Sequence, residues 1–205
     1  ILAKAAHFLA DGSCPIGPNT ARSAYAAAQS AVAAADAVAA GAPVAFALAR
    51  PPGHHARADA AGGFCYLNNA AIAAQRLRGT CQRVVVLDID MHHGQGIQEI
   101  FYHRDDIFYI SIHGDPLNFY PVVSGHASEV GEGVGTGFNL NIPLPHGSDA
   151  ATFFQALDQA LAAANTFAPQ AMVLSMGFDT YREDPQSKMT IDIPCPLYTS
   201  PIPRD

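Results

Sequence analysis

The sequence predicts a single-domain α/β fold, a three-layer sandwich in which helices cover both faces of a mostly parallel sheet. Strand-like and helix-like segments alternate along most of the chain, which is the pattern of such folds. The 205 residues, 49% of them hydrophobic, suffice for one substantial core. Polar motifs follow several strand-like segments, and parallel sheets bind ligands beyond the carboxyl ends of their strands.

The first half of the chain predicts two helices and two strands. Residues 24–40 are rich in alanine at helical spacing, and Gly41 follows in the position where helices commonly end. A short apolar segment at residues 43–49 is typical of a strand. A second helix is expected at residues 68–78, with another glycine after it, and residues 84–90 predict a buried strand.

The second half continues the alternation. It predicts a helix at residues 97–103, a strand at residues 107–113, a helix near residues 150–165 and a strand at residues 171–175. Alternating glycines before residue 138 suggest a phosphate-binding loop, but neither a Gly-Lys-Ser/Thr sequence nor a helix follows them. We therefore interpret them as a flexible connection into a further strand.

Composition and charge argue against several functional classes. The formal net charge of −7 disfavours binding to nucleic acid or an anionic membrane, and weakly favours a small cationic substrate. The four cysteines form no Cys-x-x-Cys pair, so we expect a reduced, cytoplasmic protein without disulfides. The longest apolar region, residues 24–40, is too weakly hydrophobic to cross a bilayer, and we find no signal peptide.

Both ends of the chain are expected to be incomplete or artificial. The sequence starts at Ile1, without an initiator methionine. Its last residues, 195–205, contain three prolines without periodicity and resemble a translated sequencing-library adapter; a natural proline-rich tail is the alternative. We expect one partial domain at residues 1–194, a non-native tail at residues 195–205, and a sheet that is incomplete at both ends.

The most informative segment ends the strand predicted at residues 84–90. Asp88, Asp90 and His92 alternate along an extended chain and therefore share one face. Carboxylate oxygens with an imidazole nitrogen, and no thiolate nearby, suit a catalytic zinc site. A helix N-terminus with capping aspartates would explain the carboxylates, but not the two histidines that accompany them.

Two other strand ends carry candidate site residues. The adjacent histidines His54 and His55 follow an Arg-Pro-Pro-Gly turn, and imidazoles on a tight turn suit proton transfer because they titrate near neutral pH. Ordinary polar loop histidines are the alternative reading. Asp179 follows the strand predicted at residues 171–175 and becomes the candidate third ligand beside Asp90 and His92.

Two glycine- and aromatic-containing segments are ambiguous by themselves. Gly63 and Phe64 precede a predicted helix, and the glycine allows the backbone to approach another group closely. The pair Phe119-Tyr120 follows the strand predicted at residues 107–113, and aromatic residues in such a place usually fill a core.

Together, and in order across roughly residues 14–191, these motifs resemble the zinc-dependent histone deacetylase and acetylpolyamine amidohydrolase superfamily, whose fold is arginase-like. Four segments are similar to the bacterial acetylpolyamine amidohydrolase branch: Arg-Pro-Pro-Gly-His-His-Ala at 50–56, Gly-Phe-Cys-Tyr-Leu-Asn-Asn at 63–69, His-Gly-Asp-Pro at 113–116 and Asn-Ile-Pro-Leu-Pro at 141–145. Class I histone deacetylases are more distant.

The resemblance implies an amidohydrolase that removes acetyl groups from acetylated amines such as N-acetylpolyamines. Asp90, His92 and Asp179 would bind zinc, which would act as Lewis acid and water activator. Asp88, Asp90, His92 and Ser111 would hold a potassium ion beside it. The implied partner is a small cationic acetylated amine, and family analogy adds a homodimer.

The catalytic roles fall to His54, His55, Asp88 and Gln95. His55 would take a proton from the water and later deliver one to the leaving amine. His54 would stay charged or hydrogen-bonded against Asp88, behind the ligand Asp90. Class I histone deacetylases carry an acidic residue where this chain has Gln95, so an amide would orient His55 without adding carboxylate basicity.

Substrate binding is implied for Gly63, Phe64 and Tyr120. The Gly63 backbone would hold the scissile amide, and the two rings would line a narrow tunnel for an aliphatic chain. The family's oxyanion-stabilising tyrosine should follow residue 190 and is absent, a loss on the order of 10²–10³ in rate. We therefore expect the 205-residue chain alone to be feebly active, inactive or poorly folded.

Two alternatives remain open from the sequence. The same chemistry could act on acetyl-lysine in proteins. A noncatalytic relative could bind a metal or a partner without turnover, although a binding module has no need of a proton-transfer pair beside its metal. Iron(II) or cobalt could also occupy the ligands in place of zinc.

Overall fold

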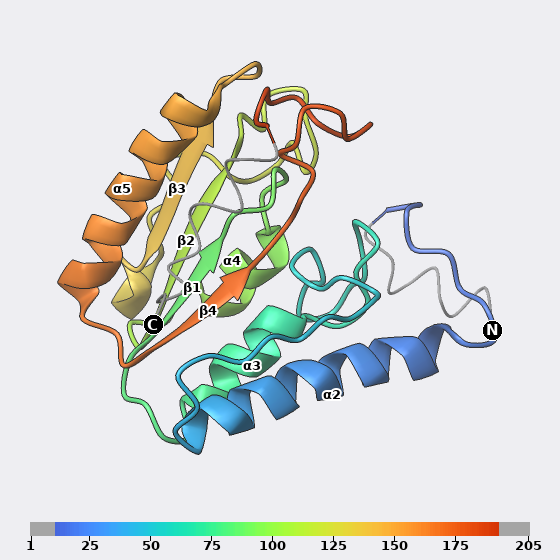
Figure 1. Ribbon diagram of the computed structural model, residues 1–205, viewed down its shortest axis with the longest axis vertical. Coiled ribbons are helices and arrows are strands. Elements are labelled where there is room, and N and C mark those ends of the chain that lie inside the picture. The colour runs from blue at the N-terminus through green and yellow to red at the C-terminus, as the bar shows by residue number, and fades with distance from the viewer. Residues whose placement is uncertain (1–10, 193–205) are drawn as a thin grey trace.

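The computed structural model describes residues 11–192 and contains a parallel sheet with helices on both faces (Figure 1). Its strand order is β3-β2-β1-β4, and every neighbouring pair is parallel. The strands are β1 (Val84–Asp88), β2 (Ile107–Gly114), β3 (Asn139–Leu144) and β4 (Ala171–Ser175). The helices are α2 (Thr20–Ala39), α3 (Asn69–Leu77), α4 (Gln95–Phe101) and α5 (Ala150–Phe167). The predicted three-layer α/β fold is confirmed.

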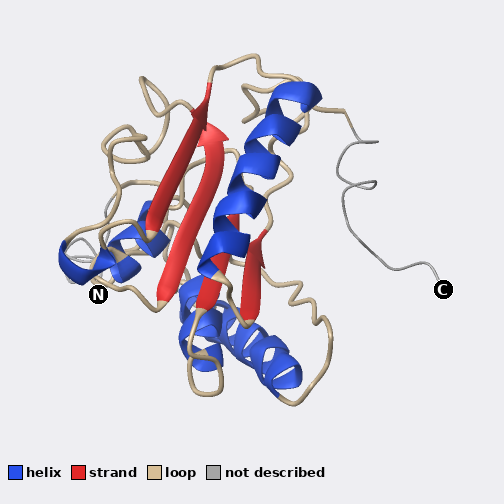
Figure 2. Cartoon of the chain, turned by 90° about the vertical axis from the view of Figure 1, so that its left-hand side faces the viewer, coloured by secondary structure: helices blue, strands red, loops and turns tan. Residues whose placement is uncertain are grey.

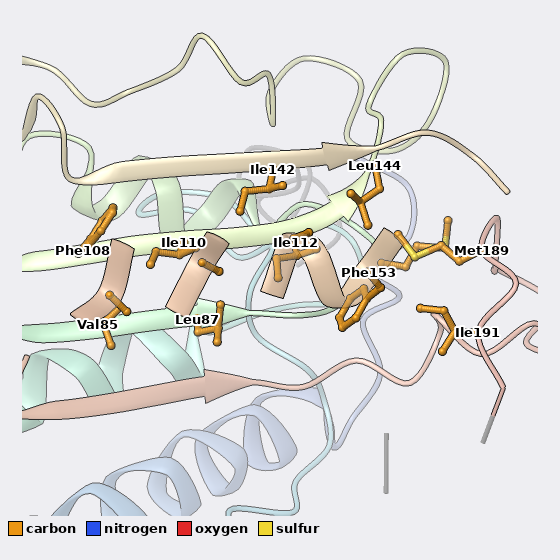
Figure 3. Close-up of a cluster of buried hydrophobic side chains, with 14 of the residues drawn as sticks. Val85, Leu87, Phe108, Ile110, Ile112, Ile142, Leu144, Phe153, Met189 and Ile191 are labelled. Carbon is orange, nitrogen blue, oxygen red and sulfur yellow. The ribbon is translucent and has the colours of Figure 1, made fainter. Parts of the chain in front are cut away.

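Two hydrophobic clusters separate the three layers. Side chains of a strand alternate between the two faces of a sheet, so Val85 and Leu87 pack towards α5 while Val84 and Val86 pack towards α3 and α4. Figure 3 shows the first cluster, in which Phe153 of α5 lies against the strands, and Figure 2 shows α5 running across that face. Burial on both faces explains why β1 is an uninterrupted apolar run.

The helices follow from small residues and from capping side chains. Alanines recur at helical spacing along the buried face of α2, where Ala31 and Ala35 join the cluster that contains Ala74 of α3. Small side chains allow this close approach. Asn68 caps α3 by accepting a hydrogen bond from the Ala71 amide, a common way for a helix to begin.

The strand predicted at residues 43–49 is wrong, because the structure has no strand there. Val44, Phe46 and Leu48 do alternate, but all three side chains are exposed, at 78%, 69% and 85%. A strand forms only where a neighbouring strand accepts its backbone hydrogen bonds, and none of the strands described in residues 11–192 pairs with this segment. The outer strand β4 also leaves two apolar side chains, Met172 and Leu174, exposed among the described residues 11–192.

The remaining elements agree with expectation to within a few residues. The glycine series leads through a short 3-10 helix, Gly133–Gly135, into β3, as the interpretation of a connecting segment required. Cys14, Cys65 and Cys81 are free, whereas Cys195 and the tail predicted at residues 195–205 lie outside the described residues. No helix within residues 11–192 has the length and hydrophobicity that a membrane span requires.

Candidate active site

Asp90, His92 and Asp179 meet at the carboxyl ends of two neighbouring strands. Strands β1 and β4 are adjacent and in register, so the loops that follow them lie side by side. One ligand atom from each of the three side chains lies within 4.8 Å of the others. His92 Nδ1 is 2.7 Å from Asp179 Oδ2 and 3.5 Å from Asp90 Oδ1. The structure therefore brings together the three residues predicted to bind metal.

Backbone contacts hold this cluster in shape. The Met91 amide donates to Asp179 Oδ1 over 2.9 Å, and the His92 amide donates to Asp90 Oδ1 over 2.9 Å. Gly177 packs so closely that a Cβ at this position would collide with the Asp90 carboxylate. These contacts orient both carboxylates towards the His92 ring before any ligand arrives.

The charges of the cluster favour a cation. Burial lowers the pKa of His92, but hydrogen bonds and charge from Asp179 and Asp90 outweigh it and raise that pKa to about 9. Burial conversely raises the pKa of Asp90, while His54 and His92 lower it, with a net decrease. One imidazole nitrogen with two carboxylates is also a donor set that catalytic zinc uses. The residues therefore fit a divalent metal ion.

His54 lies beneath this cluster and faces carboxylates. Its Nδ1 is 2.9 Å from Asp88 Oδ2, and its Nε2 is 3.8 Å from Asp90 Oδ2. The Tyr109 hydroxyl also donates to Asp88 Oδ2, over 3.2 Å. Burial lowers the pKa of His54, but the charges of Asp88 and Asp90 raise it to about 9. The two carboxylates therefore favour the protonated form of His54.

His55 is the neutral neighbour of His54. The two ring centroids are 3.9 Å apart, and His55 Nδ1 lies 2.6 Å from Gln95 Oε1. Burial and repulsion by the charge on His54 hold the pKa of His55 well below its usual value. A neutral imidazole with one nitrogen bound to an amide keeps its other nitrogen free to accept a proton.

Two of the three predicted substrate-binding residues, Gly63 and Tyr120, lie against His55. Gly63 has a φ of +53°, and a Cβ at this position would collide with the His55 ring, so only glycine allows this approach. The Tyr120 ring stands edge-on to His55 with centroids 4.9 Å apart. Phe64 follows Gly63 and is 59% exposed.

Comparison with known proteins identifies the family. Residues 2–198 match the histone deacetylase domain. The chain belongs to the histone deacetylase domain family. Over 93% of its length it is 65% identical to an acetylpolyamine amidohydrolase from Burkholderia pseudomallei, and it covers 56% of that protein. Over 95% of its length it is 48% identical to acetylpolyamine amidohydrolase 1 from Pseudomonas aeruginosa, of which it also covers 56%.

Fold similarity supports the same family. A solved structure of an acetylpolyamine aminohydrolase from Burkholderia pseudomallei superposes with a TM-score of 0.90 and 66% identity, covering 92% of this chain and 55% of that one. The chain thus spans about half the length of the family members that it matches.

The potassium site suggested by the family resemblance stays a prediction. Asp88 and Ser111 are fully buried and lie opposite each other in the register of β1 and β2. Ser111 Oγ, however, lies 2.8 Å from His113 Nδ1 in a hydrogen bond of its own.

Sequence reasoning assigned no role to three residues of this candidate site. Phe119 stacks on His92, with centroids 4.7 Å apart and planes 19° apart, and so fixes the ring of a predicted ligand. Gly177 makes room for Asp90. Asp11 accepts a hydrogen bond from Tyr120 across a gap of 109 residues. Only Phe119 had a sequence signal, its position beside a residue already selected.

Proposed function

We propose that the parent protein, meaning the natural full-length protein that contains this chain, is a zinc-dependent amidohydrolase that removes acetyl groups from small cationic acetylated amines. One observation carries this proposal: two imidazoles, His54 bonded to a carboxylate and His55 bonded to an amide, lie side by side next to a cluster of metal-binding character. Membership in the histone deacetylase domain family and two relatives named as acetylpolyamine amidohydrolases support it.

The metal would be held by Asp90, His92 and Asp179. Zinc bound there would act as Lewis acid on the amide carbonyl and would lower the pKa of water. Stacking by Phe119 and the hydrogen bond from the Met91 amide keep the ligand set in place. The identity of the metal and the potassium ion remain proposals, as do a cytoplasmic location and a homodimer.

Proton transfer would belong to His55. Its free Nε2 takes a proton from the attacking water while a C–O bond forms at the acetyl carbon. The C–N bond then breaks, and the same imidazole delivers a proton to the leaving nitrogen, giving acetate and a free amine. His54 lies between Asp88 and Asp90, which favour its protonated form, and a positive charge there would suppress protonation of His55 between turnovers.

Small cationic substrates are favoured over acetyl-lysine in proteins. The relatives named above are acetylpolyamine amidohydrolases, and the chain has a net charge of −7. Phe64 and Tyr120 would contact the aliphatic part of the substrate, and the Gly63 backbone would hold its amide. We also propose that residues 1–194 form part of this catalytic domain and that residues 195–205 are non-native. An uninterrupted genomic reading frame through the tail would refute the last point.

The experiment is a comparison of substrates with the zinc-loaded parent protein. We expect a higher kcat/KM for N-acetylputrescine than for an acetyl-lysine peptide. The reverse order would favour the protein deacetylase alternative. Stoichiometric zinc without turnover of either substrate would favour a noncatalytic relative. An Asp179→Ala variant, which removes a ligand from the metal cluster, serves as the inactive control.

A further inference from the structure

We propose that Asp11 is a positioning residue that determines which nitrogen of His55 carries the proton, acting through Tyr120 and Gln95. The inference rests on the proposed function, because it concerns the imidazole that would act as general base. A series of hydrogen bonds between residues that are far apart in sequence connects Asp11 to His55.

The chain of hydrogen bonds has three links. The Tyr120 hydroxyl donates to Asp11 Oδ2 over 2.7 Å. The Gln95 amide nitrogen donates to the Tyr120 oxygen over 3.1 Å. Gln95 Oε1 lies 2.6 Å from His55 Nδ1. All four residues belong to different segments, and none of the links involves a predicted metal ligand.

The direction of every link follows from the carboxylate. An ionised carboxylate can only accept hydrogen bonds, so Tyr120 must donate its proton to Asp11. The tyrosine oxygen is then the acceptor, so Gln95 must present its NH₂ group to Tyr120 and its carbonyl to His55. That carbonyl needs a donor, so His55 carries its proton on Nδ1 and leaves Nε2 free as the base.

Because residue 95 is an amide, Gln95 cannot by itself determine which nitrogen of His55 carries the proton. A carboxylate beside His55 would accept only, and would fix the proton on Nδ1 unaided. A glutamine can present either its oxygen or its NH₂ group, and a tyrosine hydroxyl can donate in either direction. Asp11 is the acceptor-only group that removes this ambiguity from the hydrogen-bond chain.

Asp11 is held ionised at its place. The Ser13 amide donates to Oδ1 over 2.8 Å, the Ser13 hydroxyl also donates to it, and the Gly63 amide donates to Oδ2 over 3.1 Å. Burial raises the pKa of Asp11, but these donors and Tyr120 lower it to about 2. The same bonds tie the Asp11 loop to Gly63, so a purely structural role is the competing explanation.

The test uses Tyr120→Phe in the parent protein, because this change keeps the ring and removes only the hydroxyl. We expect kcat to fall about 10-fold with KM unchanged, the usual scale for partners that orient a site residue. Tyr66→Phe is the matched control, since its hydroxyl bonds the Pro15 carbonyl in the same loop but lies outside the hydrogen-bond chain. The control should leave kcat unchanged.

A second variant separates positioning from loop structure. In the Gln95→Glu background, the carboxylate fixes the His55 proton by itself, so adding Tyr120→Phe should no longer lower kcat. An equal loss in both backgrounds would show a structural role and overturn the proposal.

Nitrogen-15 spectra of histidine-labelled protein give a readout independent of turnover. We expect one Nδ1–H tautomer for His55 in the wild type and a mixture of tautomers in both Tyr120→Phe and Asp11→Asn. Unchanged spectra in these variants would overturn the proposal. An inactive wild type would refute the proposed function alone, because the spectra would still test the positioning by Asp11.

Discussion

The two halves of the candidate site contain the same side chain in opposite states. His54 and His55 are adjacent in sequence and almost equally buried, with 7% and 5% exposed. His54 faces Asp88 and is charged, whereas His55 faces an amide and is neutral. Burial lowers the pKa of both imidazoles, so the charge of the partner decides the outcome. The site thus obtains a fixed cation and a free base from one His-His sequence.

The largest expected effect comes from removing the neutral imidazole. We expect His55→Ala to lower kcat by about 10²–10⁴-fold, because the variant loses the imidazole whose Nε2 would take the proton from the attacking water. Zinc content should stay at the wild-type level, since His55 is not among the clustered ligands. Turnover and metal content of the parent protein check both expectations. Unchanged turnover would mean that another group transfers the proton.

Removing the charge beside His54 tests the other half. Asp88→Asn replaces the carboxylate by an amide of the same shape, so His54 should lose the interaction that keeps it protonated. We expect kcat to fall on the order of 10-fold to 100-fold. Asp90 would still bind metal, which zinc analysis can verify. Wild-type turnover with this variant would show that the charge on His54 is unimportant.

Gln95→Glu should make the two halves more alike. A carboxylate 2.6 Å from His55 Nδ1 raises the pKa of His55. The base must be deprotonated to act. As the pH is lowered, the variant should therefore lose activity at a higher pH than the wild type does. A pH profile of kcat/KM checks this, with the expected shift of the acid limb being upward. An unmoved limb would contradict the assignment of His55.

The smallest expected effect lies outside the site, where the same rule acts on stability. Hydrogen bonds from Arg104, opposed by burial and supported by Arg78, lower the pKa of Asp106 from 3.8 to about 2. The contribution of ionised Asp106 to the free energy of unfolding is therefore complete well above pH 3.8 and is lost as the pH falls through about 2. We expect Asp106→Asn to lower the free energy of unfolding at pH 7 by about 1 kcal/mol or less.

Urea denaturation at pH 7 and at low pH measures this contribution. The stability difference between wild type and Asp106→Asn should shrink at the acidic end. Asp105→Asn is the matched control, since Asp105 is an exposed neighbour and should show no comparable difference. Equal effects of the two substitutions would contradict the role given to the Asp106 ion pairs.

Local patterns made much of the fold and the metal cluster predictable. The apolar run of β1 needs no distant information, and the Asp88, Asp90 and His92 pattern correctly indicated a polar cluster at its end. The predicted extended chain through these three residues is wrong, because β1 ends at Asp88 and the backbone bends at residues 90–92, where the His92 amide bonds Asp90. Asp179 became a candidate because parallel strands end at one edge of a sheet, and β4 is indeed the neighbour of β1.

The rest depends on contacts that no local pattern contains. A lone carboxylate such as Asp11 has no distinguishing neighbourhood, yet it bonds Tyr120 across 109 residues. Gly177 is required only because Asp90 lies against it. Residues 43–49 have a strand-like pattern, but a strand also needs a neighbour to pair with. Pairing partners and close approaches are tertiary properties.

The most direct test of the central claim is a zinc titration of the metal-free parent protein, followed by hydrolysis of N-acetylputrescine. The account predicts that turnover rises in proportion to zinc, reaches its maximum at one equivalent per chain, and is absent in Asp179→Ala at the same zinc level. Full turnover before zinc is added, or one bound zinc without any turnover, would contradict it.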